Sequence, residues 1–157
     1  METIFATAEA KKALEQRLAD LISRRADVAN QIKAARDFGD LKENAEYAAA
    51  REAQNNLEME IGEIEVMIPN IKLFTFAKAD TAKVNIGTRV KAEIVGKKQT
   101  VEFVIVGTLD SDIDKGWISN VSPIGRALLG LDVGDVAEVK TSVTKIKYKI
   151  ISISKVS

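Results

Sequence analysis

Two apolar seams, one on each side of a short turn, constrain this chain more than any other feature. Before the turn, apolar residues recur at alternating four- and three-residue steps, and the same rhythm resumes after it. The seam residues are Leu14, Leu18, Leu21, Val28, Ile32 and Ala35 on one side and Tyr47, Ala50, Leu57, Ile61, Ile64 and Ile68 on the other. A repeat of about 3.5 residues forms a narrow stripe that is buried when two helices pack side by side. The sequence therefore predicts an antiparallel helical hairpin, a short coiled coil.

The pattern also sets the expected bounds of the two helices. The first is predicted from Ala8 to about Arg36, with Thr7 as its N-cap, and the second from about Leu41 to Met67 or Ile68. Arg25 and Gln54 interrupt the seams, and we expect both at the seam edge. Residues 1–6 are expected to be a short lead.

The turn between the helices carries the most charge. It reads Gly-Asp-Leu-Lys-Glu-Asn-Ala-Glu-Tyr over residues 39–47. In a purely structural interpretation, Gly39 ends the first helix, Asp40 caps the second, and Glu43 completes a capping box. That interpretation leaves the density of charge around the tip unexplained. Because a cap also fixes a carboxylate in place, as a metal ligand requires, both interpretations stay open.

The second half of the chain has the alternation of β-strands. An apolar period of two predicts a hairpin near residues 90–106, a third strand at Trp117–Ser119, a strand at 136–140 and a last strand at 145–156. Ile71–Phe76 could be a further short strand. Ser122 followed by Pro123 starts a short helix, which Gly130 ends.

The predicted fold class is therefore α+β. It has an N-terminal α-helical hairpin in residues 1–75, with its acidic tip at 39–47, and a small antiparallel β domain with one short helix in residues 76–157. Net charge supports this division, since residues 1–75 carry −4 and residues 76–157 carry +4.

Composition removes several functional classes. The chain has no cysteine and no histidine, so thiolate metal sites, Ser-His-Asp triads and most general-base enzymes are excluded. Any bound metal must be a hard ion held by oxygen, such as Mg²⁺. Asp110, Asp112 and Asp114 alternate, but without the glycine and glutamate of a calcium loop, so we expect a solvated loop. We expect neither a membrane span nor a signal peptide.

Two motifs carry a family resemblance. Residues 39–47, together with Ile118–Ile124, Ala127–Gly130 and Gly134-Asp135, resemble the Gre family of bacterial transcript-cleavage and elongation factors, in its GreA rather than its GreB form. The resemblance covers essentially the whole chain. It implies a coiled coil that enters the secondary channel of a backtracked RNA polymerase, and a C-terminal domain similar in fold to FKBP that docks on the channel rim. The polymerase then cleaves its own transcript at the extruded 3′ end, so the factor itself is not an enzyme.

The resemblance also assigns roles to residues. Asp40 and Glu43 match the tip acids that act in the polymerase active centre and hold an Mg²⁺ ion shared with the polymerase, with no cofactor held stably by the factor alone. Arg36 and Arg51 match basic positions near the 3′ end of the nascent RNA, although ordinary surface ion pairing would explain them equally well. Polymerase-rim contacts fall on Asn120, Ser122, Pro123 and Ile124. The implied factor is a cytoplasmic monomer.

Two other functions stay open at this point. The first is a non-cleaving modulator that binds the same channel, a type that loses or replaces its tip acids. The second is a peptidyl-prolyl isomerase, which would need a pocket lined by aromatic side chains. The β half offers only Phe76, Phe103, Trp117 and Tyr148 for such a pocket, and the sequence pattern predicts that most of these lie in the hydrophobic core.

Overall fold

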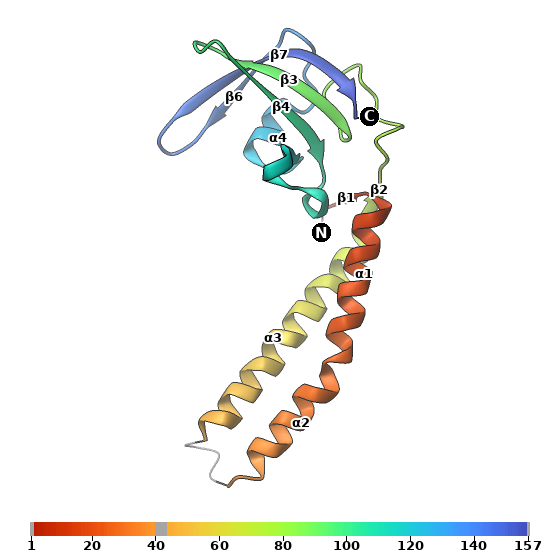
Figure 1. Ribbon diagram of the computed structural model, residues 1–157, viewed down its shortest axis with the longest axis vertical. Coiled ribbons are helices and arrows are strands. Elements are labelled where there is room, and N and C mark those ends of the chain that lie inside the picture. The colour runs from red at the N-terminus through yellow and green to blue at the C-terminus, as the bar shows by residue number, and fades with distance from the viewer. Residues whose placement is uncertain (1, 40–43, 157) are drawn as a thin grey trace. The chain divides into compact units, whose positions relative to one another are not determined.

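A computed structural model describes residues 2–39 and 44–156, and its contacts divide the chain into two compact units (Figure 1). The helical unit comprises Lys11–Asn70. The β unit comprises Glu2–Ala10 together with Ile71–Ser157. The fold class predicted from the sequence is confirmed: a helical hairpin and a β-sheet domain with one short α-helix.

The hairpin consists of α1 (Ala8–Ser23), α2 (Arg25–Arg36) and α3 (Ala45–Met67), and α2 and α3 run side by side (Figure 1). A short 3₁₀ helix, η1 (Ile68–Asn70), follows α3. The predicted seam is its core: Leu21, Leu57, Ile61 and Ile64 are buried, and Leu14, Leu18, Val28 and Ile68 pack against them. Because each helix buries only one stripe, most of its remaining surface faces solvent.

The first helix differs from its prediction in one place, a break at Arg24. The Arg24 backbone N–H bonds to the Leu21 carbonyl at 3.0 Å, which is the tighter spacing of a 3₁₀ turn. The Ser23 hydroxyl donates to the Asp20 carbonyl at 2.6 Å. Such bonds from a hydroxyl to a preceding carbonyl compete with the helical ladder and often bend a helix. The predicted N-cap is confirmed, because the Ala10 N–H donates to the Thr7 hydroxyl at 3.1 Å.

The start of the second helix was predicted wrongly. Helix α3 begins at Ala45, not near Leu41, and its N-cap is Asn44, not Asp40. The Asn44 backbone is extended, and its side chain accepts a hydrogen bond from the Tyr47 N–H. Asparagine caps helices as well as aspartate does, and the capping position stands directly before the first residue with helical dihedral angles.

The β unit is built on a five-stranded sheet in the order β5-β4-β3-β7-β6. Its strands are β3 (Thr88–Ile94), β4 (Gln99–Val106), β5 (Trp117–Ser119), β6 (Val136–Lys140) and β7 (Lys145–Lys155). The sheet is antiparallel except at one edge, where β5 pairs with β4 in parallel. Helix α4 (Pro123–Leu128) contributes Leu128 to the core, among Val90, Ile105 and Ile150. Two 3₁₀ helices, η2 (Thr108–Asp110) and η3 (Ile113–Lys115), join β4 to β5.

A second, two-stranded sheet lies outside these predictions. Strand β1 (Ile4–Ala6), expected to be a lead without structure, pairs in parallel with β2 (Ile71–Leu73). The strand predicted at Ile71–Phe76 therefore ends at Leu73. Gly107 lets β1 approach, since a Cβ atom there would lie 1.5 Å from the Phe5 carbonyl oxygen.

Candidate functional site

The hairpin tip is framed by the end of α2 and the start of α3. After α2, Gly39 adopts φ +113°, a conformation that glycine takes at little cost, as the sequence suggested. The two carboxylates predicted to act there, Asp40 and Glu43, lie outside the described residues. Their assignment therefore stays a prediction.

One asparagine side chain, that of Asn44, connects the end of α2 to the start of α3. The Asn44 Oδ1 accepts a hydrogen bond from the Tyr47 backbone N–H at 3.0 Å. The Asn44 Nδ2 donates to the Ala35 carbonyl oxygen of α2 at 2.7 Å. Asn44 was not among the predicted site residues, because the cap was predicted at Asp40. The signal that could have found it is Asn44 itself, a strong capping residue three positions before Tyr47, where the apolar repeat resumes.

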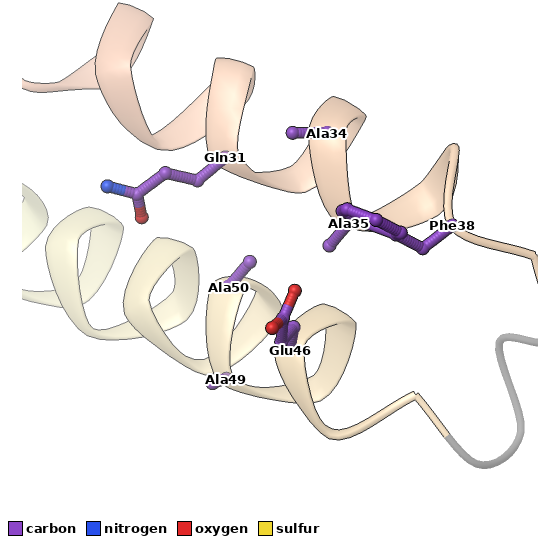
Figure 2. A pocket seen from close by; sticks show the side chains of 7 residues that line it. All are labelled: Gln31, Ala34, Ala35, Phe38, Glu46, Ala49 and Ala50. Carbon is purple, nitrogen blue, oxygen red and sulfur yellow. The ribbon is translucent and has the colours of Figure 1, made fainter.

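A groove of about 380 Å³ lies between α2 and α3, near the ends of these helices that face the tip (Figure 2). It is lined by Gln31, Ala34, Ala35, Phe38, Glu46, Ala49 and Ala50. The buried seam residues nearest the tip are Ala35 and Ala50, with Ile32 buried one turn farther back and Tyr47 half-buried. The Phe38 ring is 79% exposed rather than packed into the seam. The last buried positions before the tip are therefore alanines, which bury less apolar surface than the leucines and isoleucines of the main cluster.

The two arginines predicted to lie near RNA are both exposed on the hairpin. Arg36 is the last residue of α2, and Arg51 lies on α3, where its guanidinium donates to the Gln54 side chain at 3.1 Å. Within residues 2–39 and 44–156, no carboxylate lies within 4.0 Å of either guanidinium. The ion-pairing explanation thus has no support from the described residues, and the RNA-proximal role stays a prediction.

Ion pairs connect the helices farther from the tip. Arg25 donates two hydrogen bonds to the Glu58 carboxylate, at 2.8 and 2.9 Å, and this accounts for the polar break in the seam. These bonds lower the pKa of Glu58 and raise that of Arg25. Arg17 makes a similar pair with Glu60 at 2.8 Å. Gln54, the other break, is half-buried.

The predicted polymerase contacts lie where β5 passes into α4. Ser122 caps α4: its hydroxyl accepts from the Gly125 N–H at 3.1 Å and donates to the Ser119 carbonyl at 2.6 Å. Pro123 lies in the first turn of the helix, as predicted, and its side chain is exposed. Asn120 is half-buried, and its backbone N–H is bonded to Val106. The Ile124 side chain packs against the core.

Glycine is required inside this motif. A Cβ atom on Gly125 would lie 2.0 Å from the Ser119 carbonyl oxygen, so a larger residue would push the helix away from β5. The capping bonds and this close approach hold Ser122 and Pro123 in a defined position. Of the four predicted residues, Pro123 is exposed and the other three are half-buried.

The described residues offer no metal site of their own. In residues 2–39 and 44–156, no group of three or more acidic side chains could hold an ion. Asp110 instead bonds to the Thr7 N–H at 2.9 Å, and Asp112 caps η3 by accepting from the Asp114 N–H. The segment was expected to be a solvated loop, but it forms two 3₁₀ helices, where Asp110 and Asp112 are half-buried hydrogen-bond acceptors and only Asp114 of the three is exposed. Across the same residues, no helix is long and apolar enough to cross a membrane.

These features define a class: proteins in which a helical hairpin presents a short motif at its tip and a separate β unit carries a capped loop-and-helix motif. The family model "Transcription elongation factor, N-terminal" matches residues 4–73. The model "Transcription elongation factor, GreA/GreB, C-term" matches residues 79–155. The chain belongs to the GreA/GreB family of transcription elongation factors.

Individual relatives agree with this family. The chain is 41% identical to the transcription elongation factor GreA of Thermoanaerobacter pseudethanolicus, over 97% of this chain and 98% of the relative. It is 39% identical to GreA of Lachnoclostridium phytofermentans, over 95% and 94%. Among solved structures it is similar to the GreA factor homolog 1 (Gfh1) of Thermus thermophilus, at 20% identity and a TM-score of 0.45, over 97% of this chain and 99% of that one. The GreA-type resemblance is confirmed by the curated relatives.

Proposed function

We propose that this protein enters the secondary channel of a bacterial RNA polymerase and stimulates the polymerase's own cleavage of backtracked transcripts. Arrested complexes are thereby rescued. The observation that carries the proposal is a hairpin held by its own narrow seam, ending in the motif of residues 39–47. Such a hairpin can pass through a channel without unpacking, because its core is shared only between its own helices.

In this proposal the tip supplies two carboxylates to the polymerase active centre. Asp40 would bind the ion, and Glu43 would help to hold it or orient the attacking water. An Mg²⁺ ion at this position stabilises the charge that develops during phosphodiester hydrolysis. Two carboxylates are too few for a closed magnesium site, which fits an ion shared with the polymerase.

The remaining predicted residues would bind rather than react. Arg36 and Arg51, both exposed and without a carboxylate partner among the described residues, would lie along the extruded RNA. Asn120, Ser122, Pro123 and Ile124 would form the contact with the channel rim. Two tip carboxylates do not complete a magnesium site, and the described residues offer no group of three or more acidic side chains that could. We therefore propose a monomeric cytoplasmic factor that cuts no RNA by itself.

A non-cleaving channel modulator is the second candidate. It would share the hairpin and the rim contact but would lack a productive tip. The sequence favours the cleaving factor, because Asp40 and Glu43 are both present.

A peptidyl-prolyl isomerase is disfavoured by the packing of the aromatic residues. The rings of Phe103 and Tyr148 pack edge to face with 5.7 Å between centroids, and Tyr148 is buried. Phe76 and Trp117 pack against one another at 5.3 Å. Rings engaged in this way do not line an open pocket.

The deciding experiment adds purified protein to stalled, backtracked elongation complexes with labelled RNA. We expect rapid release of 3′ fragments and resumed elongation when nucleotides are supplied. The protein alone, on the same naked RNA, should release nothing. Binding without any gain in cleavage would favour the non-cleaving modulator instead.

A further inference from the structure

We propose that Asn44 is a positioning residue: its side chain fixes the spacing between the end of α2 and the start of α3, the two helix ends that precede and follow residues 40–43 in the chain. This inference rests on the proposed function for its consequence in cleavage. Its structural basis is independent and lies in two hydrogen bonds, from Asn44 Nδ2 to the Ala35 carbonyl and from the Tyr47 N–H to Asn44 Oδ1.

The two bonds serve different purposes. The Tyr47 N–H belongs to the first turn of α3, whose N–H groups have no partner within the helix. The Ala35 carbonyl already accepts a hydrogen bond from the Phe38 backbone N–H at 3.2 Å, and the Asn44 amide adds a second bond to it from the other helix. A cap commonly bonds to one helix end, whereas Asn44 bonds to both. Its partners also fix the orientation of the amide, because an N–H can bond only to the oxygen and a carbonyl only to the nitrogen.

Few side chains can replace this one. The position needs an acceptor and a donor on one short planar group. Aspartate supplies the acceptor for Tyr47 but would set a carboxylate oxygen against the Ala35 carbonyl. Asn44→Asp therefore keeps the cap of α3 and removes the bond to α2, which separates the two roles of the residue.

The packing near the tip explains why this bond matters there. Leucine and isoleucine fill the seam in the cluster around Leu21 and Ile61, whereas the buried seam positions nearest the tip are Ala35 and Ala50. Ile32 is buried one turn farther back, and Tyr47 beside the tip is only half-buried. The groove of about 380 Å³ beside these alanines shows how little side-chain volume fills the space (Figure 2). Because apolar burial stabilises in proportion to area, the Asn44 bond carries a larger share of helix pairing here than elsewhere.

The first test measures the spacing directly in the full chain. The sequence has no cysteine, so Lys33→Cys and Ala48→Cys, both exposed positions near the tip, give the only two sites for spin labels. We expect Asn44→Asp to lengthen and broaden the distance distribution between the labels. The matched control is Asn70→Asp, which removes a similar amide-to-carbonyl bond, 2.8 Å from Asn70 to Val66, beyond the other end of α3. It should leave the distribution unchanged.

The second test measures cleavage by the same variants on backtracked complexes. Asn44→Asp should lower the maximal rate by roughly ten- to a hundredfold, as expected when a reactive group is displaced by about 1 Å. The concentration of protein at half-maximal stimulation should not change. Asn70→Asp should match the wild type in both quantities.

The outcomes distinguish the positioning role of Asn44 from the proposed function in cleavage. An unchanged label distance in Asn44→Asp, or a wild-type rate, would overturn the positioning role. Equal loss in Asn44→Asp and Asn70→Asp would also overturn it, because it would reveal a general effect of weakened helices. If the wild type itself stimulates no cleavage, the proposed function fails, and the label distance still decides whether Asn44 holds the helix ends.

Discussion

Arg25 interrupts the apolar seam, and its ion pair with Glu58 connects α2 to α3 at this position. The guanidinium hydrogen bonds hold the pKa of Glu58 below its ordinary value. A carboxylate with a lowered folded-state pKa stabilises the fold above its unfolded pKa, and this contribution is lost as pH falls through the folded value. The pair therefore stabilises the folded hairpin at neutral pH, and this stabilisation is lost in acid.

Glu58→Gln tests this pair. We expect a small drop in the melting temperature of the helical signal at pH 7, and no difference from the wild type once the pH lies well below about 4, the ordinary range of a glutamate. Circular dichroism melts across this range measure the effect. Glu52→Gln, on the same helix and outside the ion pairs of the described residues, is the control. An equal drop for both variants would show that net charge, not the pair, is responsible.

Helix α3 carries a glycine in its middle that serves no close approach. Gly62 is exposed, and a Cβ atom there would meet nothing within 4 Å. Glycine in a helix interior costs about 0.5–1 kcal/mol relative to alanine. Gly62→Ala should therefore stabilise the hairpin by roughly that amount, measured by denaturant unfolding of the helical signal.

The same substitution at a turn should act in the opposite direction. Gly96, in the turn between β3 and β4, has φ +87° and equally open surroundings. Alanine there must adopt a left-handed conformation, at a cost of roughly 1–2 kcal/mol. If Gly62→Ala failed to stabilise while Gly96→Ala destabilised, the helix around residue 62 would have to differ from the one described.

At the element scale, the helices and strands that follow a local sequence pattern could be predicted, whereas those that depend on contacts between distant residues could not. The hairpin seam, the strand pattern and the Ser122-Pro123 start of α4 could be predicted because each depends on neighbouring residues. Strand β1 could not, because it consists of three residues whose partner, β2, lies far along the chain. Asp40 and Asn44 both cap well, and only the resumption of the apolar repeat at Tyr47 favoured Asn44; its bond to Ala35 is tertiary and could not be predicted.

For the whole molecule, the proposal assigns binding and reaction to different parts of the chain. Pro123 is exposed in the first turn of α4, and its ring is not part of the core. Pro123→Ala should weaken polymerase binding and raise the concentration needed for half-maximal cleavage, with an unchanged rate at saturation. Titration of cleavage against protein concentration separates the two quantities. A lower rate at saturation would place Pro123 in the reaction itself.

The central claim is that the tip carboxylates act inside the polymerase while the rest of the chain only delivers them. The most direct measurement is cleavage in backtracked complexes by Asp40→Asn, alone and mixed with wild-type protein. Helix α3 should be intact in the variant because Asn44, not Asp40, is its cap. We expect Asp40→Asn alone to stimulate no cleavage and, in excess, to suppress stimulation by the wild type, because it occupies the same channel. Wild-type cleavage by Asp40→Asn alone would show that this carboxylate does not act in the reaction.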